Sequence, residues 1–206
     1  MAKPWDRWYH CVCTTYGAWL QGDRRGFRER HHRRHVEGDY RAPPPPGRYE
    51  ALARHTKRSM KHPPVVLSAT DRIVVCRVMA ETLLAYKVEL IDLCVGGEHF
   101  HMLCRFPLAL PNAEDHDPGE MPGSLLTDGR DPVPRHITGR AKRAASVALG
   151  RIGRKPQGAP LWAKRCKFEP IASRRHQLAV VRYIRKHVDA HAALWSELQR
   201  TEEPTA

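Results

Sequence analysis

The chain has 206 residues, enough for one well-filled core, and it carries 35 Lys and Arg against 22 Asp and Glu. The net charge of +13 favours a polyanionic partner, nucleic acid first and an anionic membrane surface second. The opening residues MAKPWDRWYHC contain no long apolar run, and no stretch approaches the roughly 18 apolar residues of a membrane span. We therefore expect a cytoplasmic protein with no membrane segment.

The first half of the chain predicts a strand and a helix separated by a long insertion. RWYHCVCTTY, residues 7–16, is rich in aromatic and β-branched residues and predicts a strand. Residues 17–66 form a basic, proline-rich insertion without sustained periodicity, in which four consecutive prolines predict a stiff spacer. SATDRIVVCRVMAETLLAYK, residues 68–87, predicts a helix that Ser68 or Thr70 could cap.

The second half adds a hairpin, two helices and a strand. KVELIDLCV (87–95) and HFHMLCRF (99–106) are apolar runs joined by GGE, which is typical of a β-hairpin. The remaining expected elements are a loop at 107–134, a helix at 135–152, a strand at 164–171, a helix at 173–198 starting near Ser173, and a disordered tail at 199–206.

This order is strand, helix, strand, strand, helix, strand, helix. It predicts an α+β fold with a ferredoxin-like βαββαβ antiparallel sheet, helices on one face, and an additional C-terminal helix. With no internal repeat and no convincing linker, residues 1–206 are expected to form a single domain.

Cysteine usage indicates a reducing compartment. None of the six cysteines forms a CxxC pair, and most lie in apolar runs such as YHCVCTTY and IDLCVGG, which is typical of small buried hydrophobic residues rather than of a disulfide or zinc framework. They are Cys11, Cys13, Cys76, Cys94, Cys104 and Cys166.

Two histidines lie one residue apart in the second strand of the hairpin. Side chains alternate along a strand, so Phe100 and Met102 share the core face while His99 and His101 project together from the other. Two imidazoles that project from neighbouring positions on one strand face can converge on one metal ion. The alternative is two unrelated surface histidines in a chain that has thirteen.

The last predicted helix supplies a third candidate ligand and a nucleophile. In VVRYIRKHVDAH, Tyr183 and His187 are four residues apart and share a helix face. A cation beside the phenol favours phenolate, whose reference pKa is about 10, and so makes the tyrosine a usable nucleophile. The alternative is a tyrosine packed on the sheet beside a solvated histidine.

Together these motifs resemble the single-tyrosine HUH transposases, especially the REP-associated tyrosine transposases. HFH (99–101) matches the family's histidine–hydrophobic–histidine motif, and RYIRKH matches the helix that bears its tyrosine. WAKRCKFEPIASRRHQLAVVRYI resembles the strand and lead-in before that helix, and TYGAWLQGDRRG resembles the segment after the first strand in one branch. The resemblance touches segments from about residue 8 to residue 198.

The resemblance implies a metal-dependent DNA endonuclease and strand transferase. His99, His101 and His187 would hold a divalent metal, usually Mg²⁺ or Mn²⁺ in the family. The family more often has glutamine or asparagine at the third position, and three nitrogens suit Mn²⁺, Zn²⁺ or another transition metal better than Mg²⁺. Tyr183 would attack single-stranded or hairpin DNA and form a 5′-phosphotyrosine intermediate. The expected protein is a nucleoid-associated monomer or homodimer.

Basic residues in two regions are the expected DNA contacts, because guanidinium groups interleaved with an aromatic ring suit a phosphate track with stacking. They are Arg24, Arg25, Arg28, Arg30, Arg33 and Arg34 in the insertion, and Lys164, Arg165, Arg174 and Arg175 near the last strand. A solvated loop is the alternative for the first group. The alternative functions are an inactive or domesticated hairpin-DNA-binding protein, an RNA-binding ferredoxin-like domain, and a structural metalloprotein.

Overall fold

A computed structural model of the chain describes residues 5–23, 25, 27–28, 35–36, 45–110, 132–156 and 158–200. The strands are β1 (Trp8–Thr14), β2 (Phe27–Arg28), β3 (His35–Val36), β4 (Glu89–Val95), β5 (His99–Arg105), β6 (Lys167–Pro170) and β7 (Ala193–Ser196). The helices are α1 (Glu50–Arg58), α2 (Ala69–Ala85), α3 (Pro132–Arg151), α4 (Arg174–Lys186) and α5 (Glu197–Arg200), with a 3₁₀ turn at His187–Ala190.

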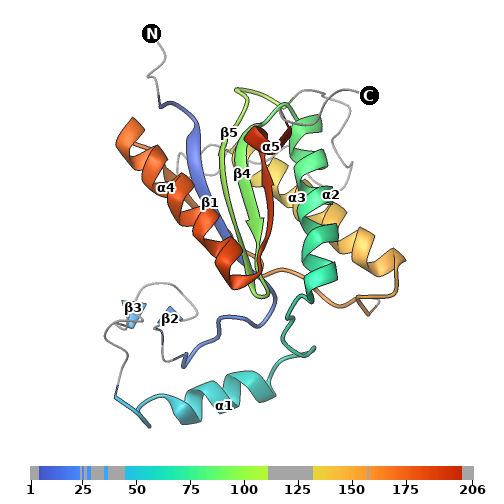
Figure 1. The fold of residues 1–206 in the computed structure, drawn as a ribbon. Coiled ribbons are helices and arrows are strands. Elements are labelled where there is room, and N and C mark those ends of the chain that lie inside the picture. The colour runs from blue at the N-terminus through green and yellow to red at the C-terminus, as the bar shows by residue number, and fades with distance from the viewer. Residues whose placement is uncertain are drawn as a thin grey trace.

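The fold is a mixed α+β arrangement around a five-stranded antiparallel sheet in the order β6-β1-β5-β4-β7. Helices α2 and α3 pack on one face of this sheet, and α4 crosses the other face (Figure 1). The short β2–β3 pair and α1 lie apart from the sheet (Figure 1). The prediction of an α+β protein with an antiparallel sheet is confirmed.

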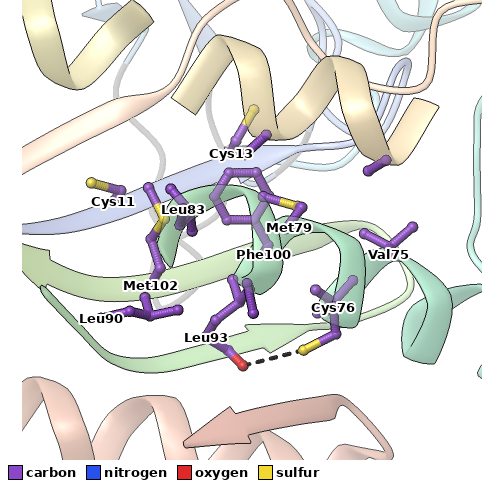
Figure 2. Close-up of a cluster of buried hydrophobic side chains, with 14 of the residues drawn as sticks. Cys11, Cys13, Val75, Cys76, Met79, Leu83, Leu90, Leu93, Phe100 and Met102 are labelled. Carbon is purple, nitrogen blue, oxygen red and sulfur yellow. Dashed lines mark hydrogen bonds between the residues drawn. The ribbon is translucent and has the colours of Figure 1, made fainter. Parts of the chain in front are cut away.

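The main core lies between the sheet and helices α2 and α3. Phe100 and Met102 of β5 are fully buried against Met79 and Leu83 of α2, and Figure 2 shows their side chains meeting there. Full burial of each such side chain stabilises the fold by roughly 1.5–3 kcal/mol. Five of the six cysteines are buried, which confirms their interpretation as small hydrophobic residues. The Cys76 thiol also donates a hydrogen bond to the Leu93 carbonyl at 3.6 Å (Figure 2).

Helix α2 begins where the sequence indicated. Ser68 is the N-cap, its hydroxyl accepts from the Asp71 amide, and the Asp71 carboxylate accepts from the Ser68 amide, which is a complete capping box. Among the described helices, none combines the length and apolar character that a membrane span requires.

The predicted helix over 173–198 is wrong beyond Lys186. His191 adopts a left-handed conformation with φ of 60°, and the chain then turns into β7, which pairs with β4 from Asp92 to Val95. β4 would otherwise present an unpaired edge, and the paired backbone together with the part-buried Trp195 outweighs the helical preference of the segment.

The insertion and the loops differ from expectation where they are described. Residues 17–66 are not irregular throughout, because they contain β2, β3 and α1. Helix α3 begins at Pro132, three residues before the expected start, as suits a proline at a helix N-terminus. Residues 111–131 of the expected loop and 201–206 of the expected tail lie outside the described residues.

Candidate metal and tyrosine site

Strand β5 presents two histidines on the face opposite the main core. Phe100 and Met102 are buried against α2, whereas His99 and His101 face α4. The predicted alternation is therefore confirmed. His101 is only 5% exposed, because α4 covers it, while His99 at the end of the strand is half-buried.

Helix α4 brings the other site residues over the sheet. Ser173 caps its N-terminus, as expected, by accepting a hydrogen bond from the His176 amide. Val180 and Ile184 are buried against the same sheet face, which orients the neighbouring Tyr183 and the helix C-cap His187 toward β5.

Three imidazoles converge at this place. One nitrogen from each of His99, His101 and His187 lies within 4.8 Å of the others. The ring centroids are 4.9 Å apart for His99 and His101, 5.2 Å for His99 and His187, and 4.7 Å for His101 and His187. The three side chains predicted as ligands are thus positioned to bind a metal ion.

The state of these rings fits a metal. Burial lowers the pKa of His101 to about 2, with help from the nearby His99, and burial also lowers the pKa of His99 and of His187. The rings are therefore neutral near pH 7 and each keeps a lone pair. The Nε2 atom of His187 is buried and has no hydrogen-bond partner among the described residues, as an unused ligand atom would.

The donor set favours a borderline metal. Three imidazole nitrogens suit Zn²⁺, Ni²⁺, Co²⁺ or Mn²⁺ better than Mg²⁺, which prefers oxygen. In tetrahedral geometry, two nitrogen atoms that each lie about 2.0–2.1 Å from one Zn²⁺ are about 3.3 Å from each other. The three imidazole rings therefore have to move closer by small side-chain rotations to bind the same ion.

Tyr183 lies against this cluster and remains accessible. Its ring centroid is 4.9 Å from that of His187 and 5.1 Å from that of His101, in edge-to-face geometry. The residue is 49% exposed. An exposed phenol next to a candidate cation site can meet an external substrate.

His10 of β1 is a site residue that the sequence interpretation missed. Its Nε2 lies 3.1 Å from Nδ1 of His101, and its ring centroid is 5.9 Å from that of Tyr183. The signal was present in RWYHCVCTTY, because Cys11 and Cys13 belong to the core face and His10 must then face the other way. Only the pairing of β1 with β5 reveals that this places it beside His101.

The predicted basic contacts are only partly described. Arg24, Arg30, Arg33 and Arg34 lie outside the described residues, as does the side chain of Arg28. Arg25 forms a salt bridge with Asp23 at 2.6 Å, and its guanidinium lies 4.9 Å from the Trp19 ring centroid.

The second basic group is exposed, and its two members on α4 lie more than two helical turns before the tyrosine. Lys164 and Arg165 precede β6 at the sheet edge, and Arg174 and Arg175 lie in the first turn of α4. At 1.5 Å per residue the start of α4 is roughly 12–14 Å from Tyr183 along the helix.

Two cations that the sequence interpretation did not single out lie nearer to the tyrosine. Arg182 immediately precedes Tyr183 on α4, and Lys186 is the last residue of that helix. Both are exposed, so they extend the basic surface of α4 up to the site.

Neither a scan of protein-family models nor a search of curated proteins finds a match to this chain.

Proposed function

We propose that this protein is a metal-dependent enzyme that nicks and rejoins single-stranded or hairpin DNA, with Tyr183 as its nucleophile. The observation that carries this proposal is the convergence of an exposed tyrosine with three neutral imidazoles from two separate elements. A metal site alone would not require a tyrosine at its edge, and a packed tyrosine would not need to be half exposed.

The fold supports the assignment to an HUH-like transposase. The order β6-β1-β5-β4, with α2 between β1 and β4 in sequence and α3 between β5 and β6, is compatible with the ferredoxin-like βαββαβ core that this proposal expects. In this proposal β7 is an addition at the β4 edge, and α4 is the tyrosine-bearing helix of the family.

The chemistry is a transesterification that conserves the phosphodiester energy. The Tyr183 oxygen forms a bond to the scissile phosphorus, the bond from phosphorus to the 3′ oxygen breaks, and that oxygen takes up a proton to become a free 3′-hydroxyl. A divalent ion, when bound, would polarise the phosphate and favour the phenolate. His99, His101 and His187 would hold that ion, and attack by a 3′-hydroxyl on the phosphotyrosine would rejoin the strand.

Electrostatics support a DNA substrate. The net charge is +13, and Arg175, Arg182 and Lys186 are exposed on the helix that carries Tyr183. Such cations can follow a phosphate backbone toward the tyrosine.

The test is formation of a covalent adduct. The protein is incubated with Mn²⁺ and end-labelled single-stranded hairpin oligonucleotides from the flanks of its own gene, and adducts are resolved on denaturing gels and mapped by mass spectrometry. We expect a metal-dependent adduct on Tyr183 in the wild type and in the control Tyr86→Phe, whose tyrosine lies at the end of α2. Tyr183→Phe should give none.

Cleavage that persists in Tyr183→Phe would contradict the assignment of the nucleophile. Hairpin binding by the wild type without an adduct on any oligonucleotide would point instead to a domesticated DNA-binding protein.

A further inference from the structure

A fourth histidine lies directly behind the three candidate ligands. His10 on β1 is opposite Leu103 of β5 in the antiparallel ladder, so its side chain shares the sheet face of His101. The His10 and His101 rings are stacked, with centroids 5.2 Å apart and planes inclined by 26°, and their nitrogens are in hydrogen-bond contact at 3.1 Å. His101 thus contacts both His10 and His187.

The hydrogen bond links the tautomers of the two rings. When both rings are neutral, they share one proton in this contact. If Nδ1 of His101 donates to Nε2 of His10, then Nε2 of His101 carries a lone pair for a metal. If the donation runs the other way, Nε2 of His101 carries the proton and cannot ligate.

A carboxylate on the neighbouring strand favours the first arrangement. Glu169 of β6 is opposite His10 in the β1–β6 ladder, so the two side chains share a face with Cβ atoms about 4.5–5.5 Å apart. Lys167 holds that carboxylate at 2.6 Å from its Nζ. Nε2 of His10 contacts His101, so Nδ1 is the ring nitrogen left to face this negative charge, and a proton on Nδ1 would leave Nε2 as an acceptor.

We infer that His10 is a positioning residue of the metal site, which fixes the Nδ1–H tautomer and the ring orientation of His101 so that Nε2 faces the ion. The inference rests on the metal site within the proposed function and extends it to a residue outside the ligand set. Supporting residues of this kind commonly change metal affinity by about 10–100-fold.

The experiment measures the tautomer of His101 and the affinity for Co²⁺, and neither measurement depends on DNA cleavage. Long-range ¹H–¹⁵N spectra of metal-free, ¹⁵N-labelled protein at neutral pH report which nitrogen of His101 is protonated, with the signals assigned from His101→Gln. Co²⁺ affinity is measured by titration for the wild type, His10→Phe, His10→Gln and His55→Phe. Phenylalanine keeps a ring without an acceptor, and the glutamine oxygen can replace Nε2. His55 is an exposed control on α1.

We expect the Nδ1–H tautomer of His101 in the wild type. The Co²⁺ affinity should be about 10–100-fold lower in His10→Phe. The affinities of His10→Gln and of the control His55→Phe should both stay within about threefold of the wild type. The inference is overturned by an Nε2–H tautomer, by an unchanged affinity in His10→Phe, by a glutamine variant as weak as the phenylalanine one, or by a wild type that binds no Co²⁺. If His10→Phe fails to fold, the tautomer of the wild type and the Co²⁺ affinity of His10→Gln still test the positioning role of His10.

The two proposals fail in different ways. If the Co²⁺ affinity depends on His10 but the protein cuts no DNA, the positioning role of His10 is supported and the proposed DNA-cleaving function is contradicted. If the protein cuts DNA but the Co²⁺ affinity is unchanged in His10→Phe, the DNA-cleaving function is supported and the positioning role of His10 is contradicted.

Discussion

Arg185 on α4 donates hydrogen bonds from Nε and Nη2 to both carboxylate oxygens of Asp92 on β4, at 2.9 and 3.2 Å. Asp92 is fully buried, and the same Nη2 atom also reaches the Ser196 hydroxyl of β7 at 3.3 Å. One guanidinium thus joins α4 to two strands, at a position midway between Tyr183 and His187. This contact fixes Tyr183 and the third candidate ligand, His187, over the sheet.

Removal of Arg185 should therefore destabilise the fold. In Arg185→Ala the buried Asp92 carboxylate has no charged partner, so we expect the free energy of unfolding to fall by about 2–4 kcal/mol, less than for a fully enclosed pair because the arginine is part-exposed. Urea denaturation measures the change. Lys186→Ala, which removes an exposed neighbour, should stay within about 0.5 kcal/mol of the wild type. Equal stability of the two variants would show that the pair does not anchor α4.

The three imidazoles should bind transition metals in preference to Mg²⁺. We expect affinity to rise from Mg²⁺ through Mn²⁺ to Co²⁺ and Zn²⁺, because nitrogen ligands follow that order. Alanine at His99, His101 or His187 removes a direct ligand and should cost more than the about 10–100-fold typical of a supporting residue. Isothermal titration calorimetry provides the measurement, and His55→Ala on α1 is the control. Strong Zn²⁺ binding that survives all three substitutions would place the ion elsewhere.

Local patterns predicted the parts of the site that depend on one element. Alternation along β5 was enough to separate His99 and His101 from the core side chains, and helical spacing was enough to pair Tyr183 with His187. The role of His10 depends on the register between β1 and β5, which spans some ninety residues of sequence and leaves no local trace. β7 was missed for a similar reason, since its strand conformation comes from the free edge of β4.

Alkaline pH should destabilise the fold through two buried thiols, that of Cys76 on α2 and that of Cys94 on β4. Burial raises the pKa of Cys76 and of Cys94 to about 12, from an ordinary value near 9. Because the folded state keeps these protons while the unfolded chain releases them, their contribution to stability is complete below about pH 9 and disappears as the pH rises toward 12.

Cys76→Ala should make the fold less sensitive to alkaline pH. We expect the decrease in unfolding free energy between pH 8.5 and 10.5 to be smaller than in the wild type by about 1–2 kcal/mol, since each pH unit corresponds to about 1.4 kcal/mol per proton. Denaturation curves across this range provide the measurement. Val75→Ala, a neighbouring buried truncation with nothing to titrate, should lower stability at every pH and leave the slope unchanged. The same pH slope in Cys76→Ala and Val75→Ala would contradict a protonated buried thiol.

The cations beside Tyr183 should set the salt dependence of DNA binding. Arg182 and Lys186 are exposed on α4, so a strand that reaches the tyrosine passes close to both. Alanine at either position removes one cation that binds a phosphate. Each substitution should therefore weaken binding to all hairpin sequences alike and reduce the slope of log K against log salt by about 0.7–1. Fluorescence anisotropy over a salt series provides the measurement.

Arg77→Ala is the matched control for these two variants, because Arg77 is exposed on α2, on the opposite side of the sheet. A strand bound along α4 does not reach that side, so the control should keep the wild-type slope. If Arg182→Ala and Lys186→Ala keep the wild-type slope while Arg77→Ala lowers it, the DNA approaches from the α2 side and cannot reach Tyr183.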